Sequence, residues 1–209
     1  MAKAGPSEGS LESHREASLP TRLHAVSLEE LEQILTAHRL YLETNRKQGT
    51  RANLSGTDLT GCDLSGKILR RIKLDHALLR NVNLAHANLQ RANLIGADLR
   101  GACLTGADLG DARISGANLE AAHLEGAVLV GADLEFAVMT KALLRRVRLR
   151  GADMSGVNLD GADLREADLR EVNLRESSHA NEAEQRVGMA ALNQDGSAVD
   201  FLEDGKGRP

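Results

Sequence analysis

Leucine returns at every fifth position through most of this chain. Counting from Leu54, an uninterrupted register of 25 pentapeptides continues to Leu174 and covers residues 52–176. The central position is leucine in 22 pentapeptides, the position two residues earlier is alanine in 17, and the residue between them is Asn or Asp in 15. Two residues after the centre, glycine occurs in 12 of the pentapeptides. Each pentapeptide therefore has two apolar positions, the alanine and the leucine two residues later, and its other positions are mostly polar or glycine.

A period of five fits neither a regular helix nor a regular strand. On an α-helix five residues advance by about 500°, so successive leucines would form no stripe. On a continuous strand an odd period places successive leucines on opposite faces. The pattern instead predicts one short extended side per pentapeptide, followed by a bend of the kind that Asn, Asp and Gly favour. Each leucine and alanine then points inward, and the residue between them points outward.

Segments such as 97–101 (ADLRG) and 117–121 (ANLEA) resemble the A(D/N)LXX signature of the pentapeptide-repeat proteins. The resemblance implies an all-β solenoid, a right-handed quadrilateral (four-sided) β-helix with four of the 25 pentapeptides in each coil and about six coils. At about 4.8 Å per stacked strand, such a rod would be about 30 Å long. The structural core is expected to contain the central residues Leu54, Leu59, Leu64, Leu94, Leu99, Leu104, Leu109, Ile114, Leu119, Leu124, Leu134, Met139, Met154, Leu164 and Leu174.

The segment before the repeats divides into two parts. Residues 1–25 scatter Gly, Ser, Glu and Pro among few large apolar side chains, and we expect them to be disordered. Residues 26–51 are interpreted as a capping helix and linker, because Ser27 and Glu30 fit a capping box at the start of a helix over about 28–46. The apolar side of this helix carries Leu28, Leu31, Leu35, His38 and Leu42.

This helix is predicted to cover the first coil, because the open end of a β-helix exposes leucines and unpaired backbone. His38 is interpreted as a partly buried packing residue rather than a ligand. After the last repeat, residues 177–209 form a C-terminal segment, with a short helix at about 180–192 and then a disordered acidic tail. A homodimer through this C-terminal end is left open.

The cysteine and histidine side chains are not expected to come together in one catalytic or metal-binding site. Cys62 points inward and Cys103 outward, two coils apart, which excludes a disulfide or a shared metal ion. His76 and His86 fall on opposite sides of the rod, and His123 lies two coils from His86. A filled convex rod also offers no substrate pocket. We therefore predict a non-enzymatic protein with no catalytic residue, no cofactor and no metal.

The distribution of charge over the four sides of the rod helps to distinguish the possible non-enzymatic functions. Repeats 1, 5, 9 and onward form side one, and sides two, three and four follow in order. Formal charges sum to −2, −1 and −1 on sides one to three and to +3 on side four, so the rod totals −1. The favoured interpretation is a protein-interaction rod or scaffold with an unknown partner. The resemblance also implies an alternative, a DNA mimic that binds DNA gyrase or another topoisomerase and protects it from inhibitors, which would confer antibiotic resistance.

A DNA mimic should be acidic throughout, since duplex DNA carries one charge per about 1.7 Å of its axis. The mixed charge of this rod therefore favours the interaction rod. Direct nucleic-acid binding is not expected, because the cations of residues 141–151 can pair with carboxylates one coil away and no aromatic platform accompanies them. No stretch resembles a membrane span and the N-terminus lacks an apolar region, so a cytoplasmic protein without membrane contact is expected.

Repeats 16–20 carry the best candidate for a partner surface. Apolar residues stand there at outward positions where polar ones are the rule, beside a group of arginines. The candidate residues are Val128, Val130, Phe136, Val138, Leu143, Arg145, Arg146, Arg148 and Arg150.

Overall fold

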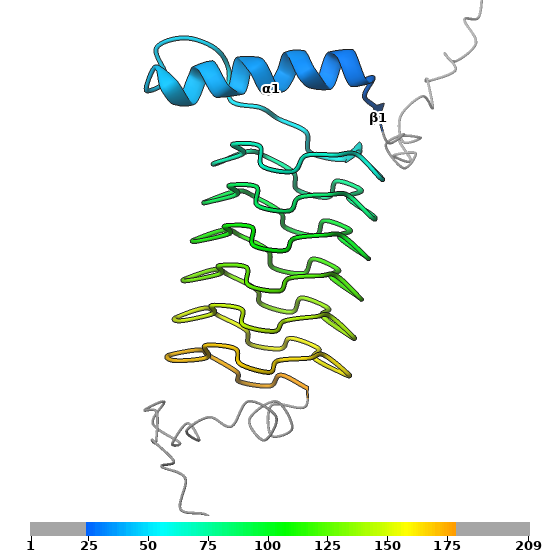
Figure 1. Cartoon of the computed structure of the whole chain (residues 1–209), viewed down its shortest axis with the longest axis vertical. Helices are drawn as coiled ribbons and strands as arrows, with labels where there is room; N and C mark the ends of the chain where they lie inside the picture. Colours follow the sequence, from blue (N-terminus) through cyan, green and yellow to red (C-terminus); the bar gives the residue numbers. More distant parts are fainter. Residues whose placement is uncertain (1–23, 179–209) are drawn as a thin grey trace, which may run out of the picture.

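The computed structural model describes residues 24–178, in which the repeats form a stack of coils beneath a single helix (Figure 1). Parallel β-bridges join residues twenty positions apart, from Asn53 with Lys73 to Asn158 with Ser178. Twenty residues are four pentapeptides, so each coil has four sides and each side carries one bridge to the next coil. The stacked, four-sided coil is thus present, while its right-handed sense stays a prediction.

Each side ends in a tight turn with a left-handed residue. In one example the N–H of Ala97 donates to the carbonyl of Leu94 (3.0 Å), and Gly96 within this turn has a φ of 62°. The corresponding residue has a positive φ in all 25 pentapeptides, although only 12 of these residues are glycine. The turn is stabilised by the stack, because the Gly96 N–H donates to the carbonyl of Ser115 in the next coil (3.0 Å).

The Asn and Asp residues at the outward position hold the following turn. In 14 of the 15 cases the side-chain Oδ1 accepts a hydrogen bond from the backbone N–H two residues later. Asn88 and Asp108 are typical, with bonds of 3.2 and 3.0 Å. The exception is Asn93, whose side-chain amide donates to Asp75 in the coil before it (2.9 Å). The sequence bias toward Asn and Asp is therefore turn chemistry.

The inward positions form a continuous apolar column. The central residues and the alanines before them are buried through nearly the whole rod, and full burial of one leucine contributes about 1.5–3 kcal/mol. Three inward residues differ from the expectation. Leu174 is only partly buried, because no coil of the described residues follows it. In the first coil Cys62 is half-buried and Lys67 is exposed, since an ammonium group is costly to bury in such a column.

Helix α1 (Leu28–Glu43) begins where the sequence predicts and ends three residues earlier. Its N-cap, Ser27, accepts a hydrogen bond at Oγ from the Glu30 N–H (3.2 Å). The helix stops because Asn45 and Arg46 have left-handed backbone conformations, with φ values of 50° and 72°. Leu28, expected on the apolar side, is instead 76 % exposed, since the first residue of the helix lies clear of the coil.

The helix crosses the end of the stack (Figure 1). The side chain of His38 holds it there. This side chain is fully buried, and its Nδ1 accepts a hydrogen bond from the Ala52 N–H (3.1 Å). The proton therefore sits on Nε2, which donates to the carbonyl of Arg70 (3.1 Å). Burial lowers the pKa of His38. The interpretation of His38 as a partly buried packing residue is thus corrected, because it makes two hydrogen bonds between the helix and the first coil.

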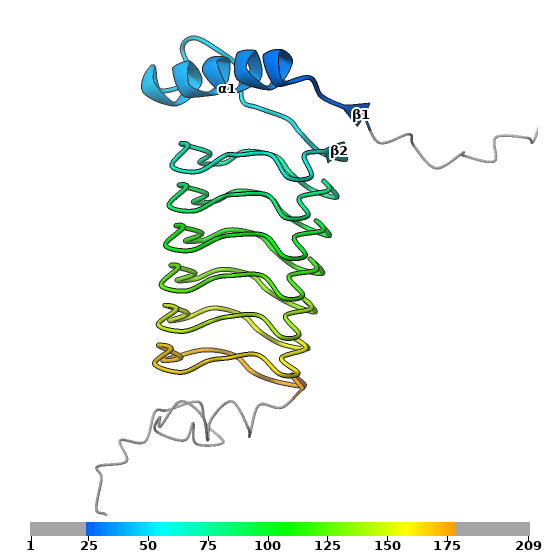
Figure 2. The same cartoon turned by 45° about the vertical axis from the view of Figure 1, so that its right-hand side comes forward.

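A short strand also joins the N-terminal segment to the rod. Strand β1 (His24–Ala25) pairs in parallel with strand β2 (Thr57–Asp58) at the edge of the first coil (Figure 2). The expectation of disorder fails for these two residues, because β2 offers unpaired backbone that β1 satisfies. The remainder of the predicted disordered segment, the predicted helix at 180–192 and the acidic tail lie outside the described residues.

Candidate functional site

The nine residues of the candidate partner surface do not all lie on the same side of the rod. Successive pentapeptides occupy successive sides, so Val138, which bridges to Asn158, lies two sides away from Val128, which bridges to Arg148. Phe136 stands at the corner that follows side one. Seven of the nine candidates do occupy two adjacent sides, three and four. We call them the arginine surface: Val128, Val130, Leu143, Arg145, Arg146, Arg148 and Arg150.

The apolar candidates are less exposed than the sequence suggests. Val128, Val130, Val138 and Leu143 are half-buried between the side chains of neighbouring coils. Only Phe136 among the five is fully exposed, at 65 %. Its ring lies over the glycine one coil later, and a Cβ added to Gly156 would come within 2.5 Å of the ring. The four arginines, by contrast, are all exposed.

A hollow of about 370 Å³ opens in the arginine surface, lined by Glu125, Gly126, Arg145 and Arg146. It exists because turn side chains in this fold lie over the turn residue of the next coil. At the same corner, His86 lies over Gly106, with its Nδ1 at 2.6 Å from an added Cβ. Nothing lies within 4 Å of a Cβ added to Gly126. Two successive glycines at this corner therefore leave one turn uncovered.

Two acidic residues partly neutralise the arginine surface from the following coil. Glu166 accepts a hydrogen bond from Arg146 Nε (2.7 Å) and lies 3.8 Å from Arg145 Nη2, and Glu171 accepts from Arg150 Nη2 (2.8 Å). The hydrogen bond from Arg146 lowers the pKa of Glu166, and the bond from Arg150 lowers that of Glu171. The arginines thus pair with carboxylates one coil away, as expected for a solvated face.

One arginine and one carboxylate oxygen of this region remain without a partner. Arg148 makes no ion pair with any residue of the described segment. Glu125 Oε2 is buried without a hydrogen-bond partner among the same residues. The arginine surface therefore offers a free guanidinium group on side four and a hollow at the corner that follows side three.

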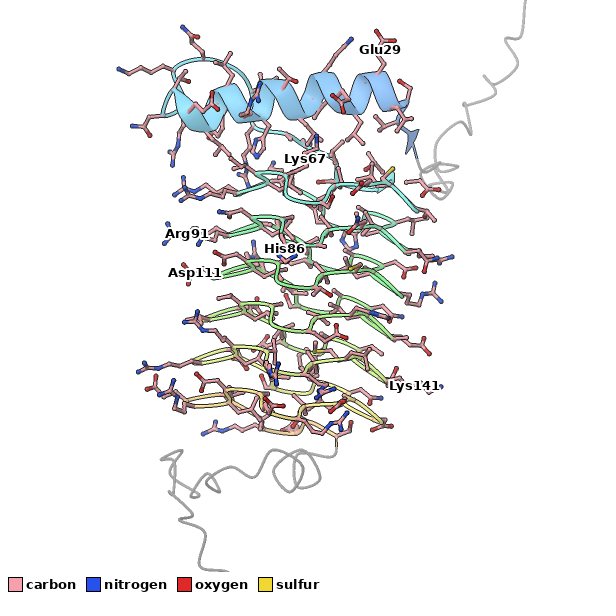
Figure 3. All side chains as sticks on the ribbon, viewed as in Figure 1. Glu29, Lys67, His86, Arg91, Asp111 and Lys141 are labelled. Carbon is pink, nitrogen blue, oxygen red and sulfur yellow. The ribbon has the colours of Figure 1, made fainter. Side chains whose placement is uncertain are left out.

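Acidic side chains elsewhere on the rod are also neutralised internally. Asp98 accepts hydrogen bonds from both Arg100 and Arg80, and chiefly the bond from Arg100 lowers its pKa to about 2. Farther around the rod, Arg91 and Asp111 form an ion pair of 3.2 Å at one edge, whereas Lys141 projects from the opposite edge (Figure 3). Asp98 and Asp111 are therefore both paired with arginines of the rod itself.

Sequence reasoning placed the helix over the first coil but did not foresee the cavities at their junction. A cavity of about 380 Å³ lies between α1 and residues 66–69, and another of about 170 Å³ lies at the end of the helix. One signal was present in the sequence: the repeat of Leu69 has Lys67 where alanine is usual and Ile68 where Asn or Asp is usual. Ile68 is 51 % exposed beside the larger cavity.

Cysteines, potential metal ligands and a long helix are the other features of residues 24–178 that bear on function. Both cysteines are free, and desolvation raises the pKa of the Cys62 thiol. Within this range no three His, Cys, Asp or Glu side chains are placed to hold a metal ion. The single long helix of the same range lacks the length and apolar character that crossing a bilayer requires.

Comparison with known proteins places the chain in a family. Solved structures with similar coils include a pentapeptide repeat protein from the Arabidopsis thaliana thylakoid lumen, with 29 % identity, a TM-score of 0.47, and coverage of 72 % of this chain and 86 % of that one. The pentapeptide repeat protein Rfr23 from the cyanobacterium Cyanothece 51142 gives 27 % identity, a TM-score of 0.31, and coverage of 67 % and 99 %.

A trypsin-treated variant of QnrB1, a plasmid-mediated fluoroquinolone resistance protein, gives 22 % identity, a TM-score of 0.40, and coverage of 74 % and 76 %. Among curated proteins, none matches. The family model for pentapeptide repeats matches in 8 copies, over residues 48–66, 72–111, 107–146 and 142–178. The matched segments cover more than half of the chain, which therefore belongs to the pentapeptide-repeat family.

Proposed function

We propose that this protein is a non-enzymatic interaction rod, and that a protein partner binds its arginine surface. The observation that carries the proposal is the hollow at Gly126, lined by Arg145 and Arg146, with the unpaired Arg148 nearby on side four. Arg148 differs in this respect from Arg80, Arg91, Arg100, Arg165 and Arg170 of the rod, which are all engaged by carboxylates. An acidic side chain of a partner could exchange with Glu166 at Arg146, or bind Arg148 directly.

Charge reversal of the arginine surface tests this proposal. A triple variant with Arg145→Glu, Arg146→Glu and Arg148→Glu keeps the inward column intact, because all three side chains are exposed. We expect a partner captured from cell extract by the wild type to be lost from the variant, since truncating or reversing contacting charges costs several kcal/mol in binding. The matched control is Arg113→Glu, an exposed arginine on side one. Equal recovery by the wild type and the triple variant would refute the proposed surface.

The alternative is a DNA mimic that protects a topoisomerase. It requires acidic side chains that are free to replace phosphates, and this requirement is poorly met where Asp98 is held by two arginines and Asp153 by Ser155 and Asn173. A gyrase supercoiling assay with and without a quinolone separates the two functions. Protection that is lost in Asp133→Asn and retained in the arginine triple variant would favour mimicry.

A further inference from the structure

We propose that the cleft between the end of α1 and the first coil binds a small anion that carries phosphate groups. The cleft has a volume of about 170 Å³ and is lined by Tyr41, Leu42, Asn45, Arg46, Arg70 and Arg71. Three arginines from two separate parts of the chain therefore line one cavity. Its lining includes no acidic side chain.

These three arginines hold the fold through their backbone and leave their side chains unused. The Arg46 N–H donates to the Tyr41 carbonyl (2.8 Å), and the Arg71 N–H donates to the Gln90 carbonyl (2.9 Å). The Arg70 carbonyl accepts the hydrogen bond from His38. None of the three guanidinium groups has a hydrogen bond or ion pair with another residue in the described part of the chain. This distinguishes them from Arg80, Arg91 and Arg100, which all bind carboxylates.

The carbonyl groups at the end of α1 do not oppose an anion in this cleft. The free carbonyls at a helix C-terminus carry partial negative charge and would repel a phosphate. Here the carbonyls of Leu40, Tyr41 and Leu42 accept hydrogen bonds from the N–H groups of Thr44, Arg46 and Asn45. A neighbouring cation adds to the positive field, because Arg51 Nε donates to the Arg71 carbonyl at the same corner of the rod.

Guanidinium groups bind carboxylates and phosphates alike, and it is the number of arginines in the lining that favours a multiply charged phosphate. A guanidinium group matches phosphate oxygens with two parallel N–H donors, and three of them complement a ligand with more than one negative charge. Tyr41 and Leu42, both half-buried, supply an apolar wall that keeps part of the bound anion away from water. Low local hydration strengthens each charge-assisted hydrogen bond. The site is thus suited to a compact, multiply charged phosphate compound.

Isothermal titration calorimetry of the full chain with inorganic pyrophosphate tests the site at low ionic strength. We expect saturable binding with one site per chain. Arg70→Gln, Arg71→Gln and Arg46→Gln should each weaken it by roughly tenfold or more, as loss of a charge-assisted hydrogen bond implies. Arg113→Gln, which removes an exposed arginine on side one, should leave binding unchanged. Because the three arginines stabilise the fold through backbone groups, the melting temperature of each variant without ligand should stay near that of the wild type.

Three results would overturn the proposal: no saturable binding to the wild type, an equal loss of binding in Arg113→Gln, or equally tight binding of malonate. Malonate carries two carboxylates, so its equal affinity would mean that the cleft responds to charge alone rather than to phosphate. A thermal shift with pyrophosphate provides a second measurement. The shift should be present in the wild type and in Arg113→Gln, and absent from a variant that combines Arg46→Gln with Arg71→Gln.

Discussion

The imidazole Nδ1 of His38 lies 3.1 Å from the backbone nitrogen of Ala52 and accepts its hydrogen bond. One residue of the helix is thereby joined to the first inward residue of the rod. The other ring nitrogen donates to the carbonyl of Arg70, in the fourth and last pentapeptide of the same coil. A single fully buried side chain thus links the helix to both ends of the first coil.

Replacement of His38 by alanine should destabilise this end of the rod. The variant loses two hydrogen bonds and leaves a cavity, so we expect the free energy of unfolding to fall by about 2–4 kcal/mol. His123→Ala is the matched control, because His123 is exposed on side three, and it should change stability by less than about 0.5 kcal/mol. Chemical denaturation measures both. Similar stabilities for the two variants would show that His38 does not hold the helix.

The same residue should make stability depend on pH. Burial lowers the folded-state pKa of His38 below the ordinary value of 6.5. The unfolded chain therefore takes up a proton first as pH falls, so stability is full above about pH 6.5 and decreases as pH falls through the range down to the folded pKa. We expect a flatter profile in His38→Ala than in the wild type between about pH 7 and pH 5. Parallel profiles, measured by denaturation at each pH, would contradict this.

Gly49 should tolerate a side chain much less well than Gly56, although both have left-handed backbone conformations with φ values of 71° and 64°. A Cβ on Gly49 would clash with the Ala37 carbonyl oxygen and lie 2.7 Å from the Tyr41 nitrogen, both backbone atoms of α1. Nothing lies within 4 Å of a Cβ on Gly56.

Gly56→Ala should therefore cost only the backbone strain, about 1–2 kcal/mol. Gly49→Ala should cost more than about 3 kcal/mol, because the linker must move away from the helix. Hydrogen exchange of first-coil amides provides the local measurement, with faster exchange expected in Gly49→Ala. Equal stability and equal exchange in the two variants would mean that the linker does not pack against α1.

Truncation of a central leucine should depend on its place along the rod. Leu104 is fully buried with coils on both sides, so Leu104→Ala should cost about 2–5 kcal/mol. Leu174 is only partly buried in the last described coil, and Leu174→Ala should cost about 1 kcal/mol. Denaturation of both variants gives the comparison. A larger loss at Leu174 would indicate that the C-terminal residues bury it.

The carboxyl group of Asp98 should have a pKa well below that of an ordinary aspartate. Its pKa of about 2, against a usual 3.8, means that its contribution to stability is present above about pH 4 and is lost as pH falls toward about 2. The hydrogen bond from Arg100 is the largest cause, so Arg100→Gln should raise the pKa of Asp98 more than Arg80→Gln. An NMR titration of the Asp98 carboxyl carbon measures this order. A larger rise in Arg80→Gln would contradict it.

The sequence alone determined the repetitive part of this protein. Leucine and alanine at a period of five leave one way to bury both, and Asn, Asp and Gly mark the turns between them. The twenty-residue coil was implied by the resemblance to pentapeptide-repeat proteins, because a period of five does not by itself say how many sides close a coil; the bridges between residues twenty positions apart confirm it. Sorting the charges by side was possible for this reason, and it correctly placed Arg145 and Arg146 on side three and Arg148 on side four.

Only the tertiary structure decided the contacts between the repeats and the N-terminal strand, helix and linker. The hydrogen bonds of His38, the pairing of β1 with β2, and the cleft lined by Arg46, Arg70 and Arg71 all join segments of different periodicity. The five-residue pattern contains no information about such contacts. Side-chain pairing also depended on geometry, because an outward arginine can reach a carboxylate within its own pentapeptide, as Arg165 reaches Asp163, or one coil away, as Arg146 reaches Glu166. The five-residue register assigns each residue to a side of the rod and to an inward or outward position. Side-chain rotamers and the neighbouring coils decide which charged groups remain free to bind a partner.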